Sequence, residues 1–253
     1  MARIQSTTGL ETSSVDEREV ARLSANAEAW WDPKGPFRPL HKLNAVRLGY
    51  IRDQVAAHFG RDPFADRPLA RLRLVDVGCG GGLLAEPLAR LGATVTGIDA
   101  AADNVEAAAR HARESDLSID YRHATAEALA GTGNRFHVVL AMEVVEHVAD
   151  RDAFLAACCR LLEPGGVIVV STLNRTVKAF ALAIVAAEYV LGWLPRGTHR
   201  WEKFVRPAEL ARGLRRHGVR LANVTGLAYS PLLDRWRLVP DAAVNYLATG
   251  VEA

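Results

Sequence analysis

A cluster of glycines directly after an apolar run is the strongest chemical signal in the sequence. Residues 74–77 lead into Gly78-Cys79-Gly80-Gly81-Gly82, and Asp99 follows 21 residues after Gly78. Glycines allow a sharp turn and let a ligand approach bare main chain, while the start of the following helix offers unpaired N–H groups. A carboxylate at this spacing is suited to accept hydrogen bonds from the hydroxyls of a ribose. The pattern predicts a nucleoside site.

The residue after the glycine cluster separates two kinds of nucleoside. A dinucleotide site requires glycine at position 83, where this chain has Leu83. A pyrophosphate therefore fits this loop less well than a smaller nucleoside without phosphates. The alternative is a plain tight turn from strand to helix with no ligand, which the acid at position 99 disfavours.

A second group of chemically active residues follows the predicted strand that ends at Met142. Glu143, Glu146 and His147 lie at i, i+3 and i+4, so a helical segment would place them on one face at the carboxyl end of a sheet. Three interpretations remain open. The three side chains hold a Mg²⁺-type cation, or His147 acts as a general base without metal. In the third, the acids are solvated at a helix start and His147 packs against the sheet.

Composition excludes several classes of protein. The 253 residues are 49% hydrophobic and 24% charged, as in one ordinary globular domain. Because 31 Lys and Arg balance 29 Asp and Glu, we expect no nucleic-acid partner. Three cysteines, with Cys158 and Cys159 adjacent, provide no disulfide framework. The first 19 residues resemble no secretory signal, so we predict a cytoplasmic location.

Short β-rich runs alternate with helical runs from residue 70 onward, which is typical of a parallel sheet covered by helices. We expect an α/β, doubly wound and mostly parallel sheet of seven strands, whose last two strands form an antiparallel pair within 219–253. Strands are predicted over 73–77, 94–98, 119–122, 137–142 and 167–172, and helices over 83–91, 102–114, 151–162 and 207–217.

The chain is expected to form a single domain after a disordered leader, 1–15. Its parts are an N-terminal helical extension (16–69), a nucleoside-binding core (70–173), an insertion (174–206) and a C-terminal helix with strands (207–253). Within the extension, Asp16 and Glu19 predict a helix start, and a second helix is predicted over 41–59. Trp30 and Trp31 are interpreted as packing aromatics rather than substrate contacts.

Longer motifs give the chain a resemblance to a known family. Its glycine loop, Asp99 and Leu162-Glu163-Pro164-Gly165-Gly166 resemble the class I S-adenosylmethionine-dependent methyltransferases, which have a Rossmann-like fold. More narrowly, the chain resembles the ubiquinone biosynthesis O-methyltransferase family. The matching motifs are Trp30-Trp31-Asp32, Pro39-Leu40-His41-Lys42-Leu43-Asn44, Arg47-Leu48-Gly49-Tyr50, Met142-Glu143-Val144-Val145-Glu146-His147, Ser171-Thr172-Leu173-Asn174-Arg175 and Asn245-Tyr246.

This resemblance implies O-methylation of a polyprenyl-substituted catechol or demethylubiquinol, with S-adenosylmethionine as methyl donor. It implies that Arg47 contacts the donor's carboxylate and that Gly78, Gly80, Asp99 and Met142 line the same pocket. It also favours Mg²⁺ at Glu143, Glu146 and His147. Ala126 and Glu127, by position alone, are expected near the adenine. Rival interpretations are a methyltransferase for another lipophile and a non-catalytic adenosyl-binding scaffold subunit.

The insertion carries an apolar run, 179–195, whose 17 residues include Glu188 and end at Pro195. This run is at the lower limit for a spanning helix, so we expect it not to cross a bilayer. Because basic residues follow it, it suits either a lid over the pocket or contact of 175–200 with the inner face of an anionic membrane. The implied polyprenyl substrate favours peripheral membrane attachment, and an enzyme complex of the ubiquinone pathway is a further expected partner.

Overall fold

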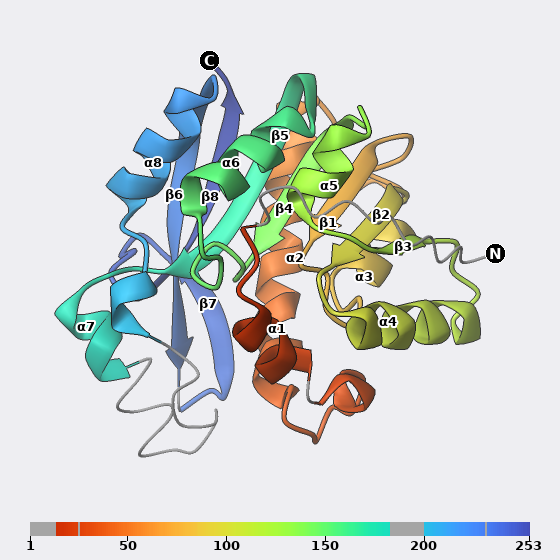
Figure 1. The fold of residues 1–253 in the computed structure, drawn as a ribbon, viewed down its shortest axis with the longest axis horizontal. Coiled ribbons are helices and arrows are strands. Elements are labelled where there is room, and N and C mark those ends of the chain that lie inside the picture. Colours follow the sequence, from red (N-terminus) through yellow and green to blue (C-terminus); the bar gives the residue numbers. More distant parts are fainter. Residues whose placement is uncertain (1–13, 25, 183–199, 231) are drawn as a thin grey trace.

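The computed structural model describes residues 14–24, 26–182, 200–230 and 232–253, and its centre is one eight-stranded sheet (Figure 1). The strand order is β3-β2-β1-β4-β5-β8-β6-β7. The strands are β1 (Arg73–Val77), β2 (Thr94–Asp99), β3 (Asp120–His123), β4 (Phe136–Met142), β5 (Leu162–Leu173), β6 (Val219–Ser230), β7 (Arg235–Val239) and β8 (Asn245–Glu252). The five strands from β1 to β5 are parallel, and β8 pairs antiparallel with both β5 and β6. The predicted α/β class is confirmed.

Helices cover both faces of the sheet. The longer helices are α1 (Glu17–Ser24), α2 (Arg38–His58), α3 (Ala85–Arg90), α4 (Ala102–Glu114), α5 (Ala126–Gly131), α6 (Arg151–Arg160) and α8 (Pro207–Arg216). Shorter turns of helix lie at Ala27–Ala29, at α7 (Val177–Ala179) and at Trp201–Lys203. One apolar core joins the sheet to α2, α3 and α4, and the other joins it to α5, α6 and α8. Both faces of the central strands are therefore buried, which explains their continuous apolar runs.

The strand order reverses between β1 and β4. β1 pairs in parallel with β2 on one side and with β4 on the other, so the connections after β1 and β4 diverge at their carboxyl ends. Open α/β sheets bind their ligands in the crevice at such a reversal. The glycine cluster follows β1 and the acidic segment follows β4, so the topology brings both predicted groups to one edge.

The structure differs from the sequence-based expectations in four places. The tail from residue 219 forms three strands rather than two, because β7 adds to the free edge of β6 as a hairpin. A short helix, α5, lies between β3 and β4 where no helix was predicted. β5 begins at Leu162, and its register shifts opposite Phe136 and Val138, so the Pro164-Gly165-Gly166 turn lies within the strand. The segment after Met142 is a turn rather than a helix.

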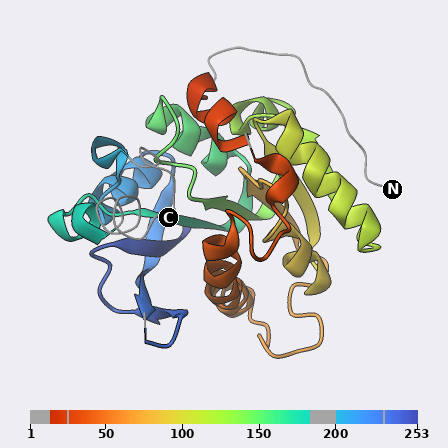
Figure 2. The ribbon, with the colours of Figure 1, turned by 90° about the horizontal axis from the view of Figure 1, so that it is seen from below.

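The part of the N-terminal extension before α2 lies across the carboxyl edge of the sheet (Figure 2). Its first helix begins where Asp16 Oδ1 accepts a hydrogen bond from the Glu19 amide at 3.4 Å, as predicted. The single predicted run to Pro33 is divided into α1, a short helical turn and further turns. The Ala149 amide donates to the Ser14 carbonyl at 2.6 Å, which ties the start of the extension to the loop after β4.

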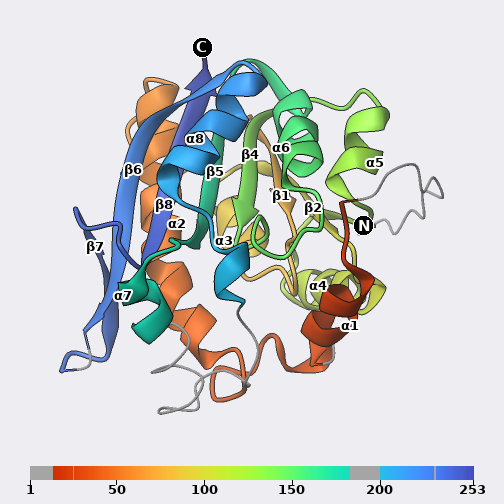
Figure 3. The same ribbon diagram turned by 60° about the vertical axis from the view of Figure 1, so that its left-hand side comes forward.

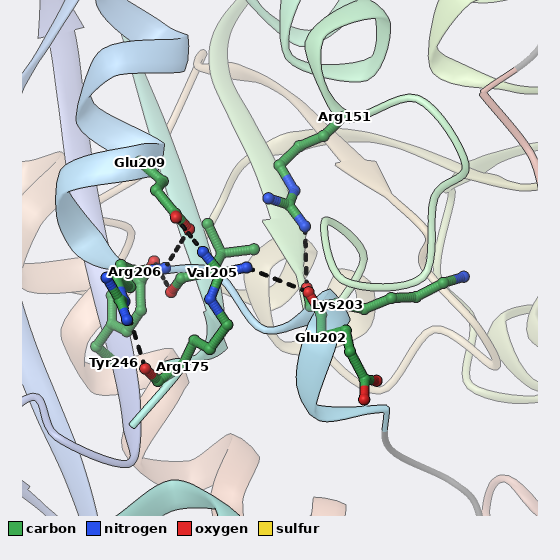
Figure 4. A network of polar contacts seen from close by, with 8 residues as sticks. All are labelled: Arg151, Arg175, Glu202, Lys203, Val205, Arg206, Glu209 and Tyr246. Carbon is green, nitrogen blue, oxygen red and sulfur yellow. Dashed lines mark hydrogen bonds and ion pairs between the residues drawn. The ribbon is translucent and has the colours of Figure 1, made fainter. Parts of the chain in front are cut away.

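The end of the insertion is held beside β5 and α8 by a polar network (Figure 4). Arg175 pairs with Glu209, and its Nη1 donates to the Glu202 carbonyl at 3.2 Å. Tyr246 Oη donates to the Val205 carbonyl at 3.0 Å. The predicted leader up to residue 13 and residues 183–199, which include most of the apolar run 179–195, lie outside the described residues. Within the described ranges, no helix is both long and apolar enough to span a bilayer.

Candidate functional site

The loop after β1 folds back on the end of β2. The amides of Gly78 and Cys79 both donate to the Ile98 carbonyl, at 2.8 and 2.9 Å. Gly78, Gly80 and Gly82 have φ values of +72°, +53° and +84°, a region that side chains disfavour. A Cβ on Gly82 would lie 2.2 Å from Tyr121 Oη. Glycine is therefore required both by the backbone conformation and by the close packing of the loop.

Asp99 is fixed in place by the loop that it faces. Its Oδ2 accepts from the Gly80 amide at 2.9 Å, and its Oδ1 accepts from the Ala101 amide at 2.8 Å and from Asn104 Nδ2 at 3.2 Å. Burial raises the pKa of Asp99, while the hydrogen bonds from Ala101, Gly80 and Asn104 act in the opposite direction. The structure brings Gly78, Gly80 and Asp99 together, as the sequence predicted.

Two tryptophans of the N-terminal extension lie on the glycine loop. Trp31 Nε1 donates to the Gly81 carbonyl at 2.8 Å, and Trp30 Nε1 donates to Asn104 Oδ1 at 2.9 Å. A Cβ on Gly81 would lie 2.3 Å from Trp30. Since Asn104 also bonds Asp99, the Trp30 indole is linked to the acid through one side chain. These tryptophans do pack, but they pack on the candidate nucleoside loop, which their spacing in the sequence did not indicate.

The turn after β4 places a carboxylate against a buried arginine. Arg47, only 2% exposed, lies with its Nη2 2.5 Å from Glu143 Oε1. Ser171 Oγ donates to the same oxygen at 2.9 Å, and the Glu143 amide donates to the Ser171 carbonyl. Glu143 has a φ of +56°, an uncommon conformation for glutamate that often accompanies functional sites. Arg47 and Ser171 together orient the Glu143 carboxylate.

Glu146 is a buried acid beside Glu143. It is 3% exposed, and within the described residues neither carboxylate oxygen has a hydrogen bond of normal geometry. Burial, followed by the charge of Glu143, raises the pKa of Glu146 well above its usual range, while the Thr172 hydroxyl and Arg47 act in the opposite direction. A buried carboxylate of this kind calls for a proton, a cation or a hydrogen-bond donor from a ligand.

His147 lies against the N-terminal extension. Its Nδ1 is 3.2 Å from Glu19 Oε2, and its amide donates to the Val144 carbonyl at 2.8 Å within the turn. In the part of the chain that the structure describes, no group of three or more His, Cys, Asp or Glu side chains is arranged to hold a metal ion. The two carboxylates are neighbours, whereas the third predicted ligand contacts Glu19.

The remaining predicted residues surround these two groups. Met142, buried, ends β4, and Ala126, buried, begins α5. Both carboxylate oxygens of Glu127 are buried without a hydrogen bond among the described residues. A Cβ on Gly78 would lie 2.4 Å from Val144 Cγ2, so the glycine loop and the acidic turn are in contact. The site therefore has a nucleoside half and an acidic half, side by side.

Comparison with known proteins identifies the family. A model of the methyltransferase domain matches residues 75–170. The chain is 59% identical, over 93% of both chains, to a ubiquinone biosynthesis O-methyltransferase of Chelativorans sp. (strain BNC1). The chain belongs to the ubiquinone biosynthesis O-methyltransferase family. Another member of this family, from Parvibaculum lavamentivorans, is 56% identical over 95% of both chains.

Solved structures show the same fold at low sequence identity. Magnesium protoporphyrin IX methyltransferase from Synechocystis with bound S-adenosylmethionine has a TM-score of 0.61, 17% identity, and a match that covers 97% of this chain and all of that one. The plantazolicin methyltransferase in complex with S-adenosylhomocysteine has a TM-score of 0.60, with 14% identity over 93% of this chain and 98% of that one. The protein thus has the class I methyltransferase fold.

Proposed function

We propose that the protein transfers a methyl group from S-adenosylmethionine to a phenolic hydroxyl of a polyprenyl catechol or demethylubiquinol on the path to ubiquinone. One observation carries the proposal. The glycine loop, held to Asp99 through the Gly80 amide, touches the turn in which Glu143 pairs with Arg47 and the buried Glu146 has no hydrogen bond of normal geometry among the described residues. Family membership supports the substrate class, because the relatives bear that function in their names.

Methyl transfer requires the protein mainly to align the methyl donor with the acceptor oxygen. When bound, the donor supplies an activated methyl group on a sulfonium, which leaves as a neutral thioether. The residues of this chain must bind its adenosyl moiety and hold the acceptor oxygen in line behind the methyl group. Such alignment accounts for about 7–11 kcal/mol of a barrier. Gly78, Gly80 and Asp99 serve the adenosyl moiety, with Met142 and Ala126 beside it.

The acidic half handles the proton of the acceptor. Glu143, Glu146 and His147 lie on the turn that the glycine loop contacts, so an acceptor bound beside this turn would have two carboxylates and an imidazole in the same segment. His147, positioned by Glu19, is the candidate general base. Arg47 is assigned to the donor's carboxylate, and its ion pair with Glu143 links the two halves.

A Mg²⁺ ion fits two of the three predicted ligands. Glu143 and Glu146 are adjacent carboxylates, and Glu146 has oxygens with no hydrogen bond in the described chain. Mg²⁺ is commonly bound by one or two carboxylates with water and substrate oxygens in its other positions. When bound, the ion lowers the pKa of a coordinated phenol. His147 remains a proposed third ligand or, alternatively, the base.

We further propose peripheral attachment to the inner face of the membrane through 175–200, with the catalytic domain in the cytoplasm. The implied polyprenyl tail and the basic residues after 195 support this placement. Flotation of the full chain and of a form lacking 175–200 on liposomes tests it. Undiminished binding by the shortened form contradicts it.

Assay of methyl transfer tests the proposed activity directly. We expect radiolabel to pass from S-adenosylmethionine to a prenylated catechol, with a higher kcat/KM than for catechol itself. Equal rates on both acceptors would favour a methyltransferase for another small molecule. Binding of the donor without transfer to any phenol would favour a scaffold subunit.

A further inference from the structure

Large apolar side chains are exposed at the tip of the β6–β7 hairpin. Leu232 is 97% exposed and Leu233 is 59% exposed, although leucine is among the residues most often buried. Together these two residues are called the leucine tip. Scattered exposed leucines need no explanation, but two consecutive ones at the end of a projecting hairpin do.

The turn that carries the leucine tip is fastened to the body of the protein. Asp234, at φ +46°, pairs with Lys42 of α2 and accepts a hydrogen bond from Tyr229 Oη. Arg38 Nη2 lies 3.7 Å from the same carboxylate. Asp234 thus faces α2, and its contacts hold the turn in a conformation in which Leu232 and Leu233 are exposed.

The hairpin projects from the carboxyl edge of the sheet, where the candidate site lies. β6 and β5 both pair antiparallel with β8, so they run in the same direction, and Leu227 of β6 and Leu173 of β5 are both level with Asn245. The leucine tip therefore lies beyond the level at which β5 ends. Figure 3 shows the hairpin end and α7 at the same end of the molecule.

A second exposed apolar group lies at that edge. Val177, Phe180 and Leu182, on and directly after α7, are all exposed. Their segment is tied to the β7–β8 connection by the Lys178–Asp241 pair and by a hydrogen bond from Thr176 Oγ1 to the Ala243 carbonyl. Two apolar groups on separate elements thus mark one end of the protein.

The charge around the leucine tip is mainly positive. Its neighbours in the turn and on α2 are the cations Arg38, Lys42, Arg235 and Arg237 and the single acid Asp234, and both β7 arginines are exposed. Apolar side chains that project between cations suit the boundary between anionic headgroups and acyl chains. Each cation near such a surface adds to the attraction.

We propose that the leucine tip inserts into the surface of an anionic lipid bilayer and directs the carboxyl edge of the sheet toward the membrane. This inference rests on the proposed function, in which the acceptor carries a polyprenyl tail. It assigns a docking element separate from 175–200, contributed by the C-terminal hairpin. The hairpin and the exposed apolar residues at α7 then hold the carboxyl edge of the sheet over the lipid that contains the acceptor.

Flotation on vesicles of equal parts phosphatidylcholine and phosphatidylglycerol tests the docking. We expect the double variant Leu232→Ser/Leu233→Ser of the full chain to bind at least about tenfold more weakly, since burial of a single leucine is worth that much. The matched control is Phe64→Ser. Phe64 is 80% exposed but precedes β1, at the opposite edge of the sheet, so its loss leaves binding unchanged. Arg235→Glu/Arg237→Glu is expected to weaken binding to these vesicles and to have little effect on pure phosphatidylcholine.

Unchanged flotation of the leucine double variant, or no flotation of the unaltered protein, overturns the inference. Sedimentation velocity tests whether the leucine tip instead contacts a second copy of the chain. If the unaltered protein is a dimer and the double variant is a monomer, the tip is a dimer contact and the inference is overturned. Methyl transfer to a short-chain prenylated catechol in solution, without vesicles, separates the two proposals. The double variant keeps that activity if only docking depends on the tip, whereas absence of that activity in the unaltered protein contradicts the proposed function itself.

Discussion

The glycine loop and the acidic turn after β4 touch at Gly78 and Val144, yet they differ in how their polar groups are bonded. Around the loop, Asp99 accepts three hydrogen bonds, and Asn104 in turn accepts one from Trp30. In the turn, Glu146 has no normal hydrogen bond within the described chain, and the Nε of the buried Arg47 also has none. Asp99, the acid beside the loop, is thus fully bonded to protein groups, whereas Glu146, the buried acid of the turn, is not.

This difference indicates separate tasks for the two halves. A carboxylate held by three protein hydrogen bonds, as Asp99 is, keeps its position when a cofactor binds, which reduces the entropic cost of binding. A buried carboxylate without partners is costly to the fold and persists where a ligand, proton or ion completes it. We therefore expect changes in the loop to act on cofactor affinity and changes in the turn to act on turnover.

The largest expected effect comes from neutralising the acidic turn. Glu143→Gln and Glu146→Gln should each lower kcat about 100-fold or more, because proton transfer or cation binding needs the carboxylates. Calorimetry should show little change in S-adenosylhomocysteine affinity for Glu146→Gln, which leaves the Arg47–Glu143 pair intact. Glutamine keeps an acceptor for Arg47, so the fold survives where alanine would leave that cation unpaired.

An exposed acid provides the control for these variants. Glu114→Gln, at the end of α4, should leave kcat unchanged. If Glu143→Gln and Glu146→Gln also turn over at the normal rate, the acidic half has no chemical role and the comparison of the two halves fails.

The next largest effect is expected at Asp99. Asp99→Ala should weaken S-adenosylmethionine binding about 10- to 100-fold, since a hydrogen bond to a charged group contributes about 1.5–3 kcal/mol. Turnover at saturating donor should change far less. The matched control is Asp103→Asn, because Asp103 is an exposed acid in the first turn of α4, just after Asp99. Equal donor affinity in the Asp99 and Asp103 variants would remove Asp99 from the cofactor site.

A smaller effect is expected where Trp30 packs on the loop. Gly81→Ala places a methyl group about one bond length too close to the indole, and such overpacking costs roughly 1–3 kcal/mol. Thermal unfolding should show the loss, and Trp30→Ala in the same chain should restore part of it. Gly131→Ala, with no atom within 4 Å of the added group, should have little effect. Equal stabilities for both glycine variants would show that the tryptophan does not pack on the loop.

A further expected effect is a pH dependence of stability. Burial, followed by the charge of Asp99, raises the pKa of Asp76 from its ordinary 3.8 to about 7. Because the folded state holds this proton more tightly than the unfolded state, the free energy of unfolding falls as pH rises from about 4 to about 7. Asp76→Asn should reduce the decrease of the unfolding free energy with pH, by at most about 1.4 kcal/mol per pH unit. Chemical denaturation at pH 4.5 and 7.5 measures it, and an unchanged slope would contradict it.

Short-range patterns predicted most of the nucleoside half. The apolar run into the glycines and the acid 21 residues later lie together because a parallel strand pair fixes the spacing of its two carboxyl ends. The cap at Asp16, the proline in the first turn of α8 and the stop at Gly218 were also predictable from local chemistry.

Long-range contacts were beyond the reach of these patterns. Nothing near Trp30 in sequence indicates that it packs on Gly81, and Arg47 meets Glu143 only because α2 passes the end of β4. The segment after Met142, which would bring Glu143, Glu146 and His147 to one face if it were helical, is a turn, since Glu143 adopts a positive φ and bonds Ser171. α5 was missed because six residues are too few for a clear period.

Calorimetric titration of the full chain with S-adenosylhomocysteine, and separately with NAD, tests the adenosyl site most directly. The account predicts one site for S-adenosylhomocysteine, strongly weakened in Asp99→Ala, and no binding of NAD. No heat from S-adenosylhomocysteine, or equal binding of NAD, would contradict it.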